Sequence, residues 1–314
     1  QRKGRLFIRW SSIAASILLL AGVVGYLMYS QESEDKTMQL VNIGPGSPKA
    51  ELVLPQGQVI ELDSSSREIL LANHQSKVTS SKNTLIYGGD TDSVAVEYHT
   101  VRIPLGGEFS LQLSDNTRVY LNSGSSLRYP VRFAGGVREV FLTGEGFFEV
   151  TKDNERPFIV KTEDVDVSVL GTSFNVNAYP DEKMVQTTLV SGSVDVSCPE
   201  CSNSESVSLV PNEMAVFEAG RQKIEKKRVD ITPYVAWHEG FLTFHDESLG
   251  SIAKKLERWY DLTFEFDQPE TKELVFYGSI KRHENISQVL DMLRCTNLIS
   301  FTIIDSKTVR VTRL

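Results

Sequence analysis

A run of 21 residues without a charged side chain, from Trp10 to Ser30, constrains this chain more than any other feature of its sequence. As an α-helix at about 1.5 Å per residue, the run would be about 31 Å long, which matches a hydrocarbon core of about 30 Å. Trp10, Tyr26 and Tyr29 lie near its ends, where amphipathic rings favour the membrane interface. The sequence therefore predicts one transmembrane helix over residues 10–30.

The charges on the two sides of this run are asymmetric. Arg2, Lys3, Arg5 and Arg9 precede it, and Glu32, Glu34 and Asp35 follow it. By the positive-inside rule, the stub 1–9 lies in the cytoplasm and the chain from about residue 31 lies outside it. A cleaved signal peptide is the alternative, but the apolar stretch exceeds the usual ~7–15 residues and no Ala-x-Ala site follows. Because the chain begins at Gln1, we expect it to be part of a longer product.

The composition is that of a folded protein without a nucleic-acid partner. The 314 residues are 40% hydrophobic and 24% charged, which suits a globular core and about two modest domains. The net charge of −8 argues against nucleic-acid binding, which needs an excess of basic residues. The sequence contains no P-loop, dinucleotide fingerprint or His-Glu-x-x-His motif, and we expect no cofactor and no metal site.

The middle of the chain, from about residue 38 to 228, has the pattern of β-strands. In the segment 165–169, for example, valines alternate with Asp166 and Ser168, and glycines separate one short segment from the next. This region shows no helical periodicity. The sequence therefore predicts a mainly β domain, either a β-sandwich or a stack resembling a β-solenoid.

A weak internal repeat lies within this region. Residues 52–64 align without gaps on residues 111–123, and each copy is read as strand, turn and strand, with the turn centred on Gly57 or Asn116. Glycine and asparagine are the residues that best tolerate a positive φ in such turns. The repeat favours stacking, although any β-hairpin has this pattern and two copies do not establish a solenoid.

The pattern changes after Asp230 to that of a small α+β module. The predicted order is β-α-β-β-α-β-β, with both helices on one face of a single small sheet. Its predicted elements are a strand at 241–244, a helix capped by Ser248, strands at 262–266 and 274–280, a helix from Asn285, and strands at 300–304 and 308–312. Trp259 and Tyr260 are interpreted as core residues rather than contact surface, and Cys295 as a small core residue of the second helix.

Three weaker features allow alternative interpretations. Cys198 and Cys201 are interpreted as a local disulfide or free thiols in a polar loop, and less readily as a redox motif or half of a metal site. The basic run at 223–228 is interpreted as a solvated hinge, or else a docking site for an acidic partner. Glu145 and Glu149 could be the paired carboxylates of a glycan hydrolase or protease, although charges facing outward explain them equally well.

Four blocks, in order, carry a resemblance to a known family. They are FSLQLSDNTRVYLNSGSSLRYP at 109–130, REVFLTGEGFFEVTK at 138–152, RPFIV at 156–160 and VLGTSFNVNAY at 169–179. These blocks resemble the FecR domain of anti-sigma regulators. The region after Trp237 resembles the C-terminal domain of Bacteroidetes-type members, which is similar to the short N-terminal domain of secretins and TonB-dependent transporters.

The resemblance implies a relay across the cell envelope. Such regulators sit in the inner membrane as single-pass proteins, with the N-terminus in the cytoplasm and the C-terminus in the periplasm. Their periplasmic part senses the signalling domain of a TonB-dependent outer-membrane transporter for iron or glycan uptake. A cytoplasmic N-terminal domain, which would precede Gln1 here, holds an extracytoplasmic-function sigma factor, and an intramembrane protease releases it.

The resemblance also implies one reaction. Some family members cleave themselves at a Gly-Thr bond, which corresponds here to Gly171–Thr172. In the implied N-to-O acyl shift, the Thr172 hydroxyl attacks the Gly171 carbonyl and water hydrolyses the resulting ester. The sequence identifies no base, and His99 and His74 are candidates only by elimination. The structural alternative is a bulge at Gly171 followed by an ordinary strand residue.

These inferences divide the chain into five parts. They are a cytoplasmic stub (1–9), a transmembrane helix (10–30), a periplasmic linker with a first β segment (31–100), a FecR-like β domain (101–228) and an α+β docking domain (237–314). The predicted function is that of a signal relay, not of a metabolic enzyme. The alternatives are a membrane-tethered periplasmic protein that binds or processes glycans, and a passive envelope scaffold.

Overall fold

The structure is a computed structural model of the 314-residue chain. It describes Val24 and residues 43–65, 67–70, 77–81, 84–88, 97–201 and 206–314, with the backbone alone at 67–70, 77–81 and 87–88. The stub and, apart from Val24, the predicted transmembrane helix lie outside the described residues. Within the described ranges, no helix is both long enough and apolar enough to cross a membrane.

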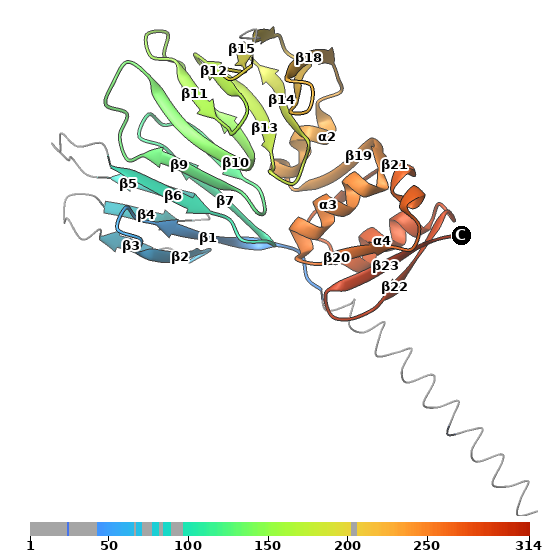
Figure 1. The fold of residues 1–314 in the computed structure, drawn as a ribbon. Coiled ribbons are helices and arrows are strands. Elements are labelled where there is room, and N and C mark those ends of the chain that lie inside the picture. Colours follow the sequence, from blue (N-terminus) through green and yellow to red (C-terminus); the bar gives the residue numbers. More distant parts are fainter. Residues whose placement is uncertain are drawn as a thin grey trace, which may run out of the picture.

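Two long β-sheets form most of the molecule (Figure 1). The first sheet has the strand order β2 (Val59–Asp63), β1 (Ser47–Val53), β6 (Tyr98–Arg102), β9 (Ser126–Pro130), β10 (Arg138–Glu149), β11 (Phe158–Lys161), β12 (Asp166–Val169), β15 (Val194–Ser197) and β16 (Ser206–Leu209). The second has the order β3 (Arg67–Leu70), β4 (Lys77–Ser81), β5 (Thr84–Gly88), β7 (Gly107–Gln112), β8 (Arg118–Leu121), β10, β13 (Ser173–Ala178), β14 (Met184–Ser191), β17 (Glu213–Glu218) and β18 (Lys223–Arg228).

Strand β10 belongs to both sheets. Thr143 pairs with Ser126 in the first sheet, whereas the next residue, Gly144, pairs with Ala178 in the second. Gly144 has a φ of 91°, and a Cβ at this position would lie 2.7 Å from the Cα of Ser125. Only glycine accepts both that conformation and that approach, so Gly144 allows β10 to bend from one sheet into the other.

The two sheets face each other around one hydrophobic core. Leu127 and Val160 of the first sheet and Leu111, Phe148 and Phe174 of the second are fully buried in the same cluster. The Phe148 and Phe174 rings stack with their centroids 5.2 Å apart. Buried and more exposed residues alternate along the strands, as a two-layer sheet requires. The prediction of a mainly β domain is therefore confirmed, and its form is the sandwich.

The two copies of the sequence repeat form the same turn. The Leu54 amide donates to the Gln58 carbonyl at 2.9 Å, and the Leu113 amide donates to the Thr117 carbonyl at 2.9 Å. The turn residues Gly57 and Asn116 have φ values of 81° and 66°, as expected. The copies nevertheless belong to different sheets, because β1 and β2 lie in the first and β7 and β8 in the second.

The C-terminal module (residues 241–314) has the predicted order of elements. They are β19 (Phe241–Ser248), α3 (Leu249–Tyr260), β20 (Thr263–Phe266), the 3-10 helix η2 (Pro269–Glu273), β21 (Val275–Lys281), α4 (Ile286–Arg294), β22 (Ile299–Ile303) and β23 (Thr308–Arg313). The Ser248 hydroxyl accepts from the Ser251 amide at 3.3 Å, which confirms the predicted cap. Trp259 and Tyr260 are buried, as predicted.

The expected single sheet of this module is wrong. Strand β19 pairs with β21, and β20, β23 and β22 form a separate sheet. Helix α3 contacts β19 and β20, and helix α4 contacts β21 and β22, so both helices lie between the two sheets (Figure 1). The buried residues of α3, from Leu249 to Tyr260, form a wide apolar face. One sheet packs on each side of such a face.

The structure confirms the predicted local disulfide and corrects the predictions for Cys295 and for the basic run. Cys198 and Cys201 form a disulfide, in agreement with a local bridge. Cys295 is exposed at the C-terminal end of α4, not buried in the core, because the helix ends there and its apolar face has already turned away. The basic run at 223–228 is strand β18, not a hinge, since it pairs with β17 along its whole length. Its lysines protect a sheet edge from further pairing.

Candidate functional site

Gly171 and Thr172 lie at the bend between β12 and β13. The Asp153 amide donates to the Leu170 carbonyl at 2.8 Å, and the Val150 amide donates to the Thr172 carbonyl at 2.9 Å. The carbonyl of Gly171 lies between these two bonded carbonyls. The Thr172 side chain is buried, and its hydroxyl donates to the Ser193 carbonyl at 2.9 Å. The bond is thus fixed on both sides by the sandwich.

Two glycines let the backbone crowd around this bond. A Cβ on Gly171 would lie 2.6 Å from the Cα of Lys152. Gly192 has a φ of 93°, and a Cβ there would lie 2.7 Å from the Thr172 hydroxyl and 3.0 Å from the Gly171 carbonyl oxygen. A larger residue at Gly171 would clash with Lys152, and a larger residue at Gly192 would displace the Thr172 hydroxyl. The packing therefore holds the nucleophile predicted from the sequence in a close-fitting position next to the bond.

An open hollow of about 320 Å³ borders the bond, and a carboxylate lines it. The charged residues of its lining are Arg118, Glu149 and Lys152, with Thr172 at its wall. Glu149 is the register partner of Ser173 across β10 and β13, and its carboxylate lies 3.5 Å from the Arg118 guanidinium. Sequence reasoning did not place Glu149 beside Thr172, since only the pairing of distant strands does so.

His99, one of the two histidines proposed as a base, does not line this hollow. His99 lies on β6, where its Nε2 is 3.1 Å from Glu97 Oε1 and its backbone pairs with Tyr129. Burial lowers the pKa of His99. His74 lies outside the described residues. Of the two candidate bases, the structure therefore describes only His99, and it places His99 outside the lining of the hollow.

The structure does not bring Glu145 and Glu149 together as a catalytic pair. Glu145 lines the pocket beside Trp237 and the C-terminal module, whereas Glu149 lines the separate hollow beside Thr172. The Glu145 carboxylate accepts from Asn122 Nδ2 at 2.7 Å and from Asn175 Nδ2 at 3.0 Å. Burial raises the pKa of Glu145. Its partners make it part of the contact with the C-terminal module.

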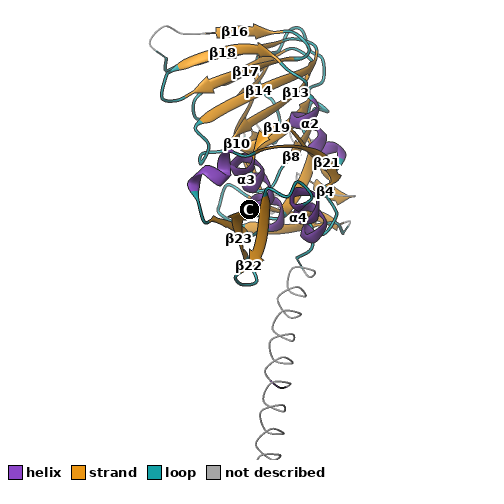
Figure 2. Ribbon diagram, turned by 90° about the vertical axis from the view of Figure 1, so that its right-hand side faces the viewer, coloured by secondary structure: helices purple, strands orange, loops and turns teal. Residues whose placement is uncertain are grey.

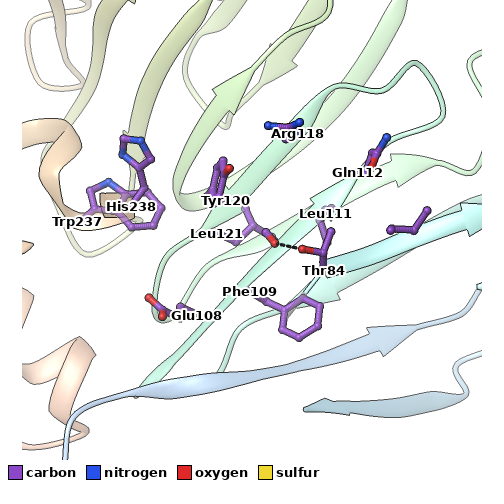
Figure 3. Close-up of a pocket in the computed structure, with 12 residues that line it drawn as sticks. Thr84, Glu108, Phe109, Leu111, Gln112, Arg118, Tyr120, Leu121, Trp237 and His238 are labelled. Carbon is purple, nitrogen blue, oxygen red and sulfur yellow. Dashed lines mark hydrogen bonds between the residues drawn. The ribbon is translucent and has the colours of Figure 1, made fainter. Parts of the chain in front are cut away.

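The linker between the sandwich and the C-terminal module packs on the outer face of the second sheet. It contains α2 (Thr232–Val235) and the 3-10 helix η1 (Ala236–Glu239). The Trp237 indole donates to Asn175 Oδ1 at 3.1 Å, and the His238 ring stacks on Phe147 at 3.7 Å. Beside the linker is a pocket of about 570 Å³ that is lined by Tyr120, Trp237 and His238 (Figure 3).

Arg282 contacts the linker, the C-terminal module and the sandwich at once. Its side chain is only 1% exposed. Its Nη2 donates to Asn122 Oδ1 at 2.7 Å, its Nη1 donates to the Trp237 carbonyl at 2.9 Å, and its guanidinium lies 3.6 Å from the centre of the Trp259 ring. Burial lowers the pKa of Arg282. A buried arginine with these partners fixes the orientation of the module on the sandwich.

Arg258, at the end of α3, makes a second connection. Its backbone carbonyl accepts from the Gly106 amide and from the Ser123 hydroxyl, both at 2.7 Å. Its guanidinium lies 2.8 Å from the Asp181 carboxylate and 2.6 Å from the Glu182 carboxylate. The first two partners precede the predicted cleavage bond in the chain, and the last two follow it. One residue of the module therefore contacts the sandwich on both sides of that bond.

Comparisons with known proteins identify the family. Residues 99–195 match the family described as FecR protein, and residues 241–311 match the one described as FecR, C-terminal. Two similar crystal structures, at 1.65 and 2.50 Å resolution, are each assigned as an anti-sigma factor from Parabacteroides distasonis ATCC 8503. They are 31% and 30% identical to this chain, cover 68% and 69% of it and 99% of their own chains, and have a TM-score of 0.63. The chain belongs to the FecR family of anti-sigma factors. No curated protein sequence is significantly similar to it.

The site of interest in this FecR-type anti-sigma factor is therefore the joint between its two matched regions. Figure 2 shows β10, β13, β14 and β17 of the FecR domain side by side next to the helices of the C-terminal domain. Arg258 and Arg282 belong to the C-terminal domain, and they contact Asn122, Asp181 and Glu182 of the FecR domain. Sequence reasoning named neither arginine. The available signal was a basic residue directly beside the apolar stripe of α3, where Arg258 precedes Trp259.

Proposed function

We propose that this chain relays a signal from the signalling domain of a TonB-dependent outer-membrane transporter to an extracytoplasmic-function sigma factor in the cytoplasm. The observation that carries the proposal is the joint at Arg258 and Arg282. Buried polar contacts hold the C-terminal domain on the FecR domain. A partner that binds one domain and disturbs these contacts therefore changes the stability of the other domain. The sigma factor would be held by a domain that precedes Gln1.

The proposed location is the inner membrane, with the N-terminus in the cytoplasm. The uncharged run at 10–30 and the basic residues before it support this orientation. The disulfide between Cys198 and Cys201 supports an oxidising compartment such as the periplasm for the FecR domain. In this arrangement an intramembrane protease would cut the span and release the sigma-binding domain.

The partner surface that we propose is the outer sheet of the C-terminal domain. Strands β19 and β21 carry large apolar side chains that point into solvent, with Tyr277 65% exposed, Val275 47% and Phe241 41%. Exposed apolar side chains on a small sheet are a feature of docking surfaces. The sheet could accept a further strand from the transporter domain at its edge.

Deletion of the gene is the direct test of the relay. We expect transcription of one transporter operon to change when the chain is removed, because the sigma factor loses its regulator. RNA sequencing of wild-type and deletion strains measures the change. A passive envelope scaffold predicts an unchanged transcriptome, and a glycan-processing protein predicts released sugars when the purified protein is incubated with envelope glycans.

We further propose that the chain cleaves itself once at Gly171–Thr172. The Thr172 hydroxyl attacks the Gly171 carbonyl carbon, a C–O bond forms as the C–N bond breaks, and the hydroxyl proton passes to the Thr172 amine. Water then hydrolyses the ester, which restores the Thr172 hydroxyl and leaves a carboxyl group on Gly171. The hydrogen bond from Thr172 to Ser193 and the crowding by Gly192 support this reaction, since they hold the hydroxyl near the bond.

An immunoblot of the membrane-inserted protein, tagged at both ends, tests the cleavage. We expect two fragments that meet near residue 171 in the wild type and one full-length band in Thr172→Ala. Ser193→Ala is the matched control, because it keeps the backbone carbonyl that accepts from Thr172. A single band in the wild type would contradict self-cleavage and leave the relay proposal in place.

A further inference from the structure

Residues 43–46, which lead into β1, lie against the C-terminal domain. Ile43 packs against the hydrophobic core of that domain. Gly46 lies directly on the indole of Trp259, and a Cβ on Gly46 would be 2.5 to 2.7 Å from three atoms of that ring. A real Cβ does not approach other atoms so closely, so the contact requires glycine at this position.

The same place joins three parts of the molecule. The amide of Ser47, the first residue of β1, donates to the Gly106 carbonyl at 3.0 Å, and the Gly106 amide donates to the Arg258 carbonyl at 2.7 Å. Trp259 itself is only 1% exposed, and its indole donates to the Arg282 carbonyl. The entering segment thus meets the domain joint at its most buried aromatic residue.

We infer that Trp259 is a seat that holds residues 43–46, so that movement of the C-terminal domain releases the chain between the FecR domain and the membrane. The consequence for signalling rests on the proposed relay. The seat is an interaction surface whose occupant belongs to the same chain. When a partner moves the C-terminal domain, the segment loses its contact with Trp259 and Ile43 leaves the hydrophobic core. The exposed segment then becomes accessible to proteases near the membrane.

Two glycines in one segment allow a matched test. Gly46→Val introduces a side chain where the Trp259 ring lies, whereas a Cβ on Gly44 would meet nothing within 4 Å. Neither glycine has a positive φ, so neither position needs glycine for its backbone conformation. Gly44→Val is therefore the control for the loss of glycine itself. Ile43→Ser is a second variant, which removes the apolar contact without adding bulk.

Hydrogen exchange of the full chain in detergent, followed by mass spectrometry, measures the seat. We expect the amides of residues 46, 47, 49 and 50 to exchange about tenfold faster in Gly46→Val and in Ile43→Ser than in the wild type, with Gly44→Val unchanged. Unchanged exchange in β13 shows in each variant that the FecR domain is folded. Equal exchange of residues 46–50 in all four proteins would overturn the inference.

The same variants separate the seat from the relay. We expect Gly46→Val to activate the transporter operon without its inducer, and Gly44→Val to leave it silent. Faster exchange in Gly46→Val without a change in transcription would support the seat and contradict the proposed relay. A change in transcription without faster exchange would contradict the seat, since signalling would then act by another route.

Discussion

Replacing Arg138 with leucine is expected to lower the free energy of unfolding of the FecR domain by about 3–5 kcal/mol. Arg138 is fully buried, and its Nη1 lies 2.8 Å from Asp115 Oδ2, which is itself buried. Its Nε donates to the Arg156 carbonyl at 3.0 Å, and its Nη1 donates to the Thr151 carbonyl at 2.8 Å. Leucine would leave the Asp115 carboxylate without its cation and two carbonyls without donors.

Urea unfolding followed by circular dichroism measures this effect. Arg118→Leu is the control, because Arg118 also pairs with a carboxylate, that of Glu149, but at the surface with its side chain 65% exposed. We expect this change to cost about 0–1 kcal/mol, since surface pairs are screened by water and salt. If the two variants lost equal stability, burial of the Arg138 pair would not be the cause.

Replacing Arg282 with leucine is expected to uncouple the two domains. The guanidinium lies over the Trp259 ring and bonds to Asn122 and to the Trp237 carbonyl, and leucine cannot replace any of these polar contacts. Removing one partner from a buried charged network typically costs about 3–5 kcal/mol. We therefore expect one thermal transition in the wild type to separate into two, one for each domain.

Calorimetry and limited proteolysis measure the uncoupling. The linker around α2 and η1 should be cut faster in Arg282→Leu, since its contacts with Asn175 and Phe147 depend on the position of the C-terminal domain. Arg310→Leu is the control, because Arg310 pairs with Glu265 at the surface of the same domain. A single transition and unchanged cutting in Arg282→Leu would show that the domains are held by other contacts.

Together the two substitutions distinguish stability from signalling. Arg138 lies within the FecR domain, so its loss weakens the domain that contains Gly171 and Thr172. Arg282 lies at the joint between the domains. Its loss leaves each domain folded, but a change in one domain no longer reaches the other. Only Arg282→Leu should change how strongly transcription responds to the transporter signal.

The sequence by itself determined the local elements. Alternating valines predicted strands such as β12, and Gly57 and Asn116 predicted the two matching turns, because backbone conformation and side-chain alternation depend on near neighbours. The helix beginning after Ser248 and the burial of Trp259 followed from the same local signals. The family resemblance placed Gly171 and Thr172, although no pattern in the chain indicated their surroundings.

The tertiary structure alone decided which distant residues meet. The bend of β10 between sheets, the division of the C-terminal strands into two sheets, and the place of Glu149 beside Thr172 all depend on strand pairing. Arg258 and Arg282 acquire their role from partners between 45 and 160 residues away. Pairings over such distances reflect the balance of packing and desolvation over the whole chain, and no short window of sequence contains that balance.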